Sequence, residues 1–187
     1  VTVNAEPIKN LNLMAAYTHT VMKELTGMPG NNAYATWANM YSIDGPNFLK
    51  LGNSRYVIPN RVIASASYTY GKDHFSLFYT GYSPSGYSFY YDGDINGDGN
   101  RYDLMYIPKD RNDIHFTSEA DADLFWNFLE QDSYLKSHKG KYAEPYSARA
   151  PFVHRFDFRW AHDFDIKIGS TMNKIVLSLD VMNVGNL

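Results

Sequence analysis

The chain has 187 residues, of which 44% are hydrophobic and 20% charged, and its net charge is −3 at pH 7. This balance excludes the strongly basic composition that nucleic-acid binding favours, so no nucleic-acid partner is expected. No apolar run approaches the ~20 residues of a membrane-spanning helix, which excludes a helical membrane protein. The 16 tyrosines and 11 phenylalanines suit a protein with aromatic girdles at two membrane interfaces, although tyrosine-rich sandwiches and glycan-binding modules share this trait. The lack of cysteine fits both classes.

Six stretches of the chain alternate polar and apolar residues, as β-strands with two different faces do. In chain order these predicted strands are 1–6, 11–20, 60–70, 74–83, 152–165 and 174–184, and the connections between them are 7–10, 21–59, 71–73, 84–151 and 166–173. Short and long connections therefore alternate. Bacterial outer-membrane barrels show this rhythm because their periplasmic turns are short and their outer loops long. We predict an all-β fold, namely a portion of an antiparallel, up-and-down transmembrane β-barrel with a helix in a long extracellular loop.

The two long connections carry many aromatic side chains, whose ring faces suit stacking on a sugar or a peptide. The candidate ligand contacts are Trp37, Tyr41, Tyr87 and Tyr90. Packing at the rim of a barrel, or anchoring at the membrane interface, explains the same residues equally well. The glycines and prolines between residues 26 and 47 predict a long structured loop rather than a linker between domains.

Residues 92–103 read DGDINGDGNRYD, in which oxygen-bearing side chains alternate with small residues. Two registers of a calcium-binding loop fit this segment. Counted from Asp92, the ligand positions hold Asp92, Asp94, Asn96 and Asp103, with Gly97 at the sharp turn. Counted from Asp94, they hold Asp94, Asn96 and Asp98, with Gly99 at the turn, but Met105 stands at the twelfth position. The register that starts at Asp92 is therefore the more complete one. Ca²⁺ is therefore the one cofactor that the sequence suggests, although neither flank predicts the helices of an EF-hand and the same residues also form turns without a metal.

A helix of about 119–138 is predicted later in the second long connection. Ser118 is suited to cap its first turn, and acidic residues follow directly. Its apolar residues recur at helical spacing: Leu124, Phe125, Phe128 and Leu129. Such a helix would pack this stripe on the barrel rim or on neighbouring loops, or present it to a partner.

The strand predicted at 152–165 separates two kinds of side chain most clearly. One face is mainly aromatic and carries Phe152, His154, Phe156, Phe158, Trp160, His162 and Phe164. The other carries the charges that we predict to face the lumen: Arg155, Asp157, Arg159 and Asp163. These charged residues could line a substrate path or bind a plug domain. The alternative is a network of ion pairs without a further role. A half-buried sheet in a soluble protein would show the same alternation.

An open sheet in lipid would leave unpaired backbone groups at its two edges, each costing several kcal/mol. The six predicted strands therefore need further strands beside them. The chain begins directly in a strand pattern and ends without a closing strand, so we expect both ends to be cut from a longer barrel.

Several segments resemble the Oar-type TonB-dependent outer-membrane receptors of the Bacteroidetes. They are NGDGNRYDLMYIP at 96–108, FW at 125–126, EQDSYL at 130–135, HKGKYAE at 138–144, RFDFR at 155–159 and LDVMNVGNL at 179–187. The resemblance covers most of 60–187 and thins toward residue 1. It implies that residues 1–187 are part of a single barrel domain, in a family whose 22 strands enclose a plug.

The resemblance further implies a location in the outer membrane of a Bacteroidetes-like Gram-negative cell and TonB-dependent uptake of a bulky nutrient such as a glycan or peptide. The partners it implies are outer-membrane lipid, the rest of the barrel and plug, TonB acting through that plug, and a surface lipoprotein lid. No motif of an enzyme active site emerges from the sequence, so none is expected. The alternative function is a soluble, extracellular glycan-binding β-sandwich in which the 92–103 loop holds a structural calcium.

Overall fold

The computed structural model describes residues 1–27 and 29–185. It is mostly antiparallel β, with 45% strand and 13% helix, which confirms the all-β class, and no closed barrel is detected in it. The chain forms two compact units. The sheet unit consists of Val1–Thr20, Ile58–Pro84 and Pro151–Leu187, and the loop unit consists of Val21–Val57 and Ser85–Ala150.

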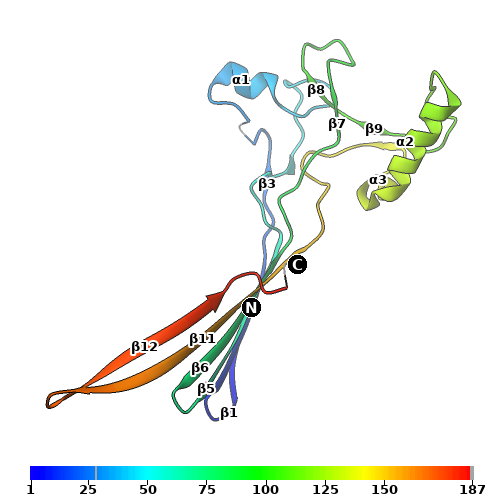
Figure 1. The fold of residues 1–187 in the computed structure, drawn as a ribbon. Coiled ribbons are helices and arrows are strands. Elements are labelled where there is room, and N and C mark those ends of the chain that lie inside the picture. Colours follow the sequence, from blue (N-terminus) through cyan, green and yellow to red (C-terminus); the bar gives the residue numbers. More distant parts are fainter. Residues whose placement is uncertain (28, 186–187) are drawn as a thin grey trace. The chain divides into compact units, whose positions relative to one another are not determined.

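The sheet unit is one layer of six strands, each antiparallel to its neighbours (Figure 1). The strands are β1 (Thr2–Ile8), β2 (Leu11–His19), β5 (Asn60–Tyr70), β6 (Asp73–Tyr82), β11 (Val153–Ile168) and β12 (Thr171–Val181). Their order in space is β1-β2-β5-β6-β11-β12. Strands thus lie in the order of the chain, which confirms the predicted up-and-down topology.

The three short connections are two-residue turns, tighter than the sequence predicted. Gly71 and Gly169 each have φ +61°, as the first central position of a type II′ hairpin turn requires. The predicted connection at 166–173 was wrong, because β11 continues to Ile168 and β12 begins at Thr171. The cause is visible in the sequence, since Ile166 and Ile168 extend the apolar side of β11. The two long connections join strand ends opposite these turns.

The strand register keeps apolar residues on one face of the whole sheet. Residues that lie directly opposite each other on paired strands share a face. One such row contains Ala5, Leu13, Ala66, Leu77, Phe158 and Val181, and the next contains Leu11, Tyr68, Phe75, Trp160 and Leu179. We call this side the apolar face. A row of the other side, the polar face, contains Asn12, Ser67, Ser76, Arg159 and Asp180.

The apolar face is not covered by a second layer of side chains. Leu177 and Leu179 of β12 are each 55% exposed, and Phe156, Phe158 and Trp160 of β11 are only half-buried. Among the residues that the structure describes, Ala161 is the only buried hydrophobic residue of the sheet unit. The sheet unit therefore has no hydrophobic core of its own.

The loop unit holds the hydrophobic core of the chain. It contains three helices, α1 (Ala33–Ala38), α2 (Glu119–Gln131) and α3 (Ser133–Ser137). It also contains three pairs of short strands: β3 (Lys23–Glu24) with β4 (Gly52–Asn53), β7 (Tyr90–Asp92) with β8 (Tyr102–Leu104), and β9 (Tyr106–Ile107) with β10 (Lys141–Tyr142). The core consists of Leu104, Met105, Ile107, Ala122, Trp126, Leu129, Leu135 and Ala143.

The predicted helix at 119–138 is present, but it is divided in two. Ser118 caps α2 as predicted, because its side chain accepts a hydrogen bond from the backbone N–H of Asp121. The division falls at Asp132, whose side chain accepts from Leu135 N at 2.9 Å and so caps α3. An Asp at this place favours a new helix start over continuation. No helix in the described part of the chain is long and apolar enough to span a membrane.

Candidate ligand pocket and acidic loop

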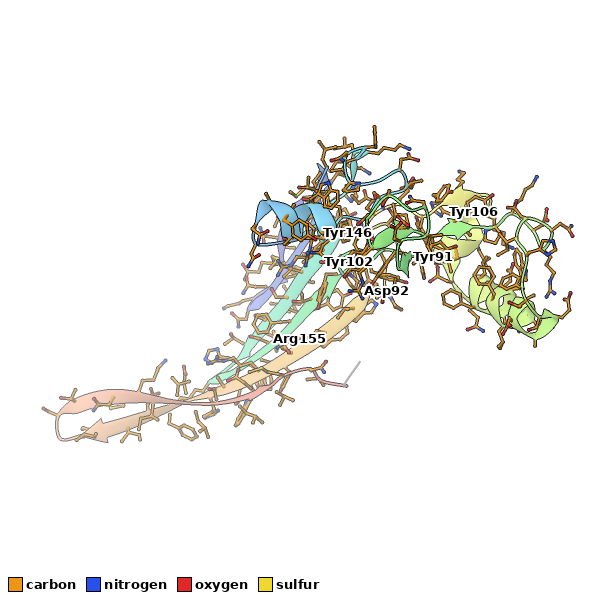
Figure 2. The ribbon with its side chains drawn as sticks, turned by 90° about the horizontal axis from the view of Figure 1, so that it is seen from above. Tyr91, Asp92, Tyr102, Tyr106, Tyr146 and Arg155 are labelled. Carbon is orange, nitrogen blue, oxygen red and sulfur yellow. The ribbon has the colours of Figure 1, made fainter. Side chains whose placement is uncertain are left out.

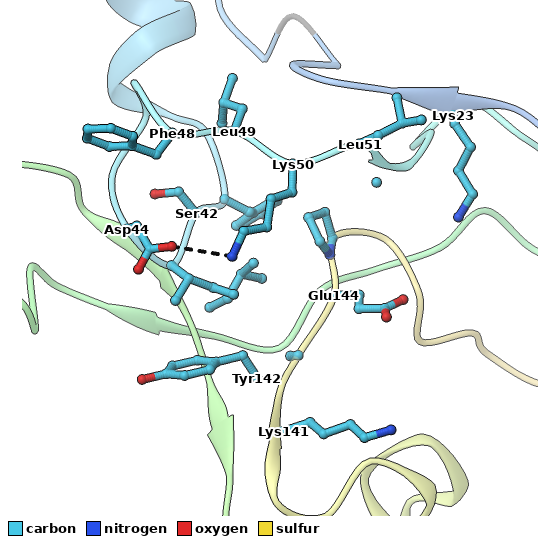
Figure 3. A pocket seen from close by; sticks show the side chains of 16 residues that line it. Lys23, Ser42, Asp44, Phe48, Leu49, Lys50, Leu51, Lys141, Tyr142 and Glu144 are labelled. Atoms are coloured by element: carbon cyan, nitrogen blue, oxygen red, sulfur yellow. Dashed lines mark hydrogen bonds and ion pairs between the residues drawn. The ribbon is translucent and has the colours of Figure 1, made fainter.

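A pocket of about 510 Å³ lies within the loop unit (Figure 3). Its lining comes from four places in the chain: β3, residues 41–52, β8, and the segment from β10 to Pro145. Phe48, Leu49 and Leu51 supply apolar surface from one segment, and Tyr142 supplies an aromatic ring from another. The volume lies within the range of roughly 300–1,000 Å³ that is typical of small-ligand sites.

Three lysines line this pocket and differ in how their charges are satisfied. The Lys50 ammonium forms an ion pair with Asp44 at 3.4 Å, and Lys23 donates to Asn53 Oδ1 at 2.6 Å. Lys141 has no carboxylate within ion-pair distance among the described residues, although Glu144 also lines the pocket. The site thus combines apolar walls with the ammonium groups of Lys23 and Lys141, neither of which has a carboxylate partner among the described residues. This combination suits a ligand with an apolar body and an acidic or hydroxyl-rich end.

Of the four predicted aromatic ligand contacts, only Tyr41 lines this pocket. Its ring centroid lies 4.9 Å from that of Tyr90, 5.4 Å from Tyr146 and 5.9 Å from Tyr102. Figure 2 labels Tyr102 and Tyr146 of this cluster. Two of the four predicted residues, Tyr41 and Tyr90, are therefore brought together by the fold.

The other two predicted contacts lie apart from this cluster. Trp37 stacks on Tyr34 with centroids 6.3 Å apart and donates its Nε1–H to Asn47. Tyr87 packs edge-on against Phe89 and donates to Asp132 at 3.4 Å. Sequence reasoning missed Lys141 and Tyr142 as pocket residues, because their position depends on the pairing of β10 with β9 across more than 30 residues.

Burial, followed by the neighbouring Tyr146, Tyr90 and Tyr102, raises the pKa of Tyr41 from 10.0 to about 12. A pKa that is higher in the folded than in the unfolded state stabilises the fold below the unfolded value, and this contribution is lost as the pH rises. We therefore expect the loop unit to lose stability between pH 10 and about 12. Thermal unfolding followed across this range should show a smaller loss for Tyr41→Phe. Tyr34→Phe, at an exposed ring, should leave the loss as it is in the unsubstituted protein.

The 92–103 segment runs from the end of β7 through the hairpin loop into β8. As expected, neither flank is a helix; both are short strands. Asp92 ends β7 opposite Tyr102 (Figure 2). Its carboxylate accepts two hydrogen bonds from Arg101, at 2.7 and 3.3 Å, and this guanidinium lowers the pKa of Asp92. Asp92 therefore forms an ion pair with Arg101 inside the hairpin.

The remaining predicted metal ligands organise the loop itself. Asp94 accepts hydrogen bonds from three backbone N–H groups, those of Gly97, Asp98 and Gly99. Asn96 and Asp98 each accept one from the residue two positions later. No three acidic or histidine side chains within the described residues form a metal-binding group by themselves, so a cation here would also need amide and backbone oxygens.

The four charged residues predicted to face a lumen share the polar face of β11. Arg155 (Figure 2) pairs with Asp157 at 2.9 Å, and Arg159 pairs with Asp180 of β12 at 3.5 Å. Asp163 lies 2.8 Å from Lys174 and 3.2 Å from His74. The geometry agrees with the alternative of mutual ion pairing, because each charge is compensated within the sheet.

Comparison with protein-family models, with curated proteins and with solved structures found no match to this chain.

Proposed function

We propose that this chain is part of an outer-membrane β-barrel receptor, in which the sheet unit supplies wall strands and the loop unit supplies extracellular loops. The resemblance to Oar-type receptors extends the proposal to TonB-dependent import of a bulky nutrient, with the plug, TonB and a lipoprotein lid as partners. Its location would be the outer membrane. The polar face would then line the hydrated interior, and the ion pairs of Arg155, Asp157, Arg159 and Asp163 would keep that wall neutral.

The observation that carries the proposal is the exposed apolar face of the sheet unit. The rows through Leu13 and Leu11 cross the sheet without a charged residue, and the charged Asp73 lies on this face at its end beside the β5–β6 turn. Burial of apolar surface is the main favourable term in folding. A single layer that leaves such a face exposed needs another apolar phase to cover it. Lipid chains cover the outward face of a transmembrane barrel in this way.

The alternative of a soluble β-sandwich requires a second sheet over that face, about 10 Å away. No second layer buries Phe156, Phe158 or Trp160 within the described residues. This observation favours the membrane function over the sandwich. The edge strands β1 and β12 each pair with one strand only, so the proposal also requires further barrel strands beside both edges.

The loop unit would supply the ligand-contacting surface of the receptor. Its pocket combines Tyr41, Phe48 and Tyr142 with the uncompensated Lys141. Aromatic and apolar walls with a few polar groups are the usual composition of a small-ligand site. Part of a glycan or peptide nutrient would fit this chemistry.

The proposal is tested by asking which face of β5 meets lipid. The chain has no cysteine, so a single introduced cysteine can be labelled uniquely with a fluorophore. Ala64 and Ala66 point to the apolar face, and Ser65 and Ser67 to the polar face. Each is replaced by cysteine, a change of little volume. In phospholipid vesicles, labels at 64 and 66 should be quenched by brominated lipid, and labels at 65 and 67 by aqueous iodide.

Quenching by iodide at all four positions, without alternation, would contradict the proposal. A second test is the cellular fraction that contains the protein. The protein should sediment with outer membranes, and its migration on gel electrophoresis should change when the sample is heated. Recovery as a freely soluble monomer would count against it as strongly.

A further inference from the structure

Three carboxylates of the β7–β8 loop have no cationic partner. The segment 92–103 contains four aspartates and one arginine, and that arginine pairs with Asp92. Asp94, Asp98 and Asp103 form no ion pair with any described residue. Three negative charges are thus held within ten residues without compensation, although like charges repel one another.

Asp103 makes this arrangement more costly, because it is only 5% exposed. Its Oδ2 accepts a hydrogen bond from Ile95 N at 2.7 Å, which turns the carboxylate into the loop between Asp94 and Asn96. Its Oδ1 is buried and has no hydrogen-bond partner among residues 1–27 and 29–185. Charges that are buried in proteins are generally paired or coordinate a metal. The fold therefore holds an anionic oxygen at this loop with a position open for a cation.

Asn100, which is fully buried, repeats this feature in the same loop. Its Nδ2 donates to Met40 O at 2.9 Å and to Ser42 Oγ at 2.8 Å. Its Oδ1, like Oδ1 of Asp103, is buried without a partner. Two unsatisfied buried oxygens in one ten-residue loop are unusual, since most buried polar side-chain atoms have a partner.

The first part of the loop matches a calcium-binding loop that starts at Asp94, although Met105 stands at the twelfth position and Asp103, at the tenth, would supply the further carboxylate. Three backbone N–H groups hold the Asp94 carboxylate, at 2.6, 2.9 and 3.1 Å. A carboxylate has about four lone-pair sites, so one remains. Gly99, with φ +84°, occupies the sixth position, where the turn needs glycine. The seventh position, which supplies a backbone carbonyl in such loops, is Asn100.

We propose that this loop binds a divalent cation, preferentially Ca²⁺, by drawing the carboxylates of Asp94, Asp98 and Asp103 together around it. The side-chain oxygen of Asn96 and the backbone carbonyl of Asn100 would complete the site, because the three carboxylates do not form a metal-binding group without the cation. Hard oxygen ligands on a flexible loop favour Ca²⁺ over Mg²⁺, which demands a small octahedral site. Asp92 is not a ligand, because Arg101 occupies its carboxylate. The site does not depend on the proposed membrane function, since every ligand lies in the loop unit.

The cation would also order one wall of the ligand pocket. Asn96 donates to Ile43 O at 2.9 Å, and Leu104 donates its backbone N–H to Ser42 O at 2.8 Å. Ser42, Ile43 and Leu104 all line the pocket. A loop fixed by Ca²⁺ would therefore hold residues 42–44 in place.

The test is a calorimetric titration of CaCl₂ into the chelator-treated protein, repeated with Asp98→Asn and Asp92→Asn. Asp98→Asn removes a ligand charge with little change of size and should weaken Ca²⁺ binding about tenfold or more. Asp92→Asn, in the same hairpin, should leave the affinity within about twofold. Tyrosine-sensitised Tb³⁺ luminescence should follow the same order, and MgCl₂ should displace Tb³⁺ less well than CaCl₂.

Stability supplies a readout that does not depend on the ligand charge of Asp98. Asp103→Asn removes the buried, uncompensated charge, so in chelator its Tm should equal or exceed that of the unsubstituted protein. Added Ca²⁺ should raise the Tm of the unsubstituted protein and of Asp92→Asn, and it should slow amide exchange at residues 42–44. Absence of any Ca²⁺ heat in the unsubstituted protein, or equal weakening by Asp92→Asn and Asp98→Asn, would overturn the site.

Discussion

Replacing Ala66 by arginine in the protein folded into phospholipid vesicles should lower its free energy of unfolding by about 2–4 kcal/mol. Ala66 lies near the middle of β5, on the apolar face between Leu13 and Leu77. An arginine there would place a charge among lipid chains at about the midplane of the bilayer. Equilibrium unfolding in urea, followed by tryptophan fluorescence, measures the loss.

Ser65→Arg is the matched control for this substitution. Ser65 precedes Ala66 in the same strand, is similar in size and exposure, and points to the polar face opposite Met14 and Phe78. Its arginine would lie in a hydrated interior, in the same cross-strand row as the acidic Asp157 with Phe78 between them, so the cost should be below about 1 kcal/mol. Equal costs for the two arginines would show that the two faces of β5 have the same surroundings.

Leu129→Ala should destabilise the loop unit by about 2–5 kcal/mol, the usual cost of removing a fully buried leucine side chain from a core. Leu129 is 0% exposed and belongs to the cluster around Ile107, Trp126 and Leu135. The alanine would leave a cavity that the short strands around it cannot readily fill. Amide exchange at α2 and β9, compared with exchange at β5, would locate the loss in the loop unit.

Leu124→Ala tests the same helix at an exposed position. Leu124 is 69% exposed, and alanine has a slightly better helix propensity than leucine, so the change should stay within about 0.5 kcal/mol. If Leu129→Ala were equally mild, the loop unit would not depend on this core. If Leu124→Ala were equally severe, the Leu124 side chain would be covered in the folded protein.

The acidic loop shows how much of a metal site a local sequence pattern can predict. Its ligand types and glycines are visible in the sequence, but both registers fit that pattern. The structure adds a contact between side chains that the pattern does not show, because Arg101 forms an ion pair with the Asp92 carboxylate. The buried positions of Asn100 and Asp103 likewise depend on residues about 60 positions earlier in the chain. Asn100 donates to Met40 O and Ser42 Oγ, and Asp103 forms an isolated β-bridge with Ser42.

The six long strands could be predicted from the sequence because strand alternation is local: with a period of two, each residue's face follows from its neighbours. The same periodicity, followed two residues further through Ile166 and Ile168, would have given the correct turn at 169–170. Only the tertiary structure decided that the apolar rows align across all six strands, that the core lies in the loop unit, and that Lys141 and Tyr142 meet Tyr41 at one pocket. The alignment of the rows depends on the pairing register of the long strands, which no single strand determines. The core and the pocket depend on strand pairs of two or three residues, which are too short to carry a periodic signal and form only because distant segments pack together.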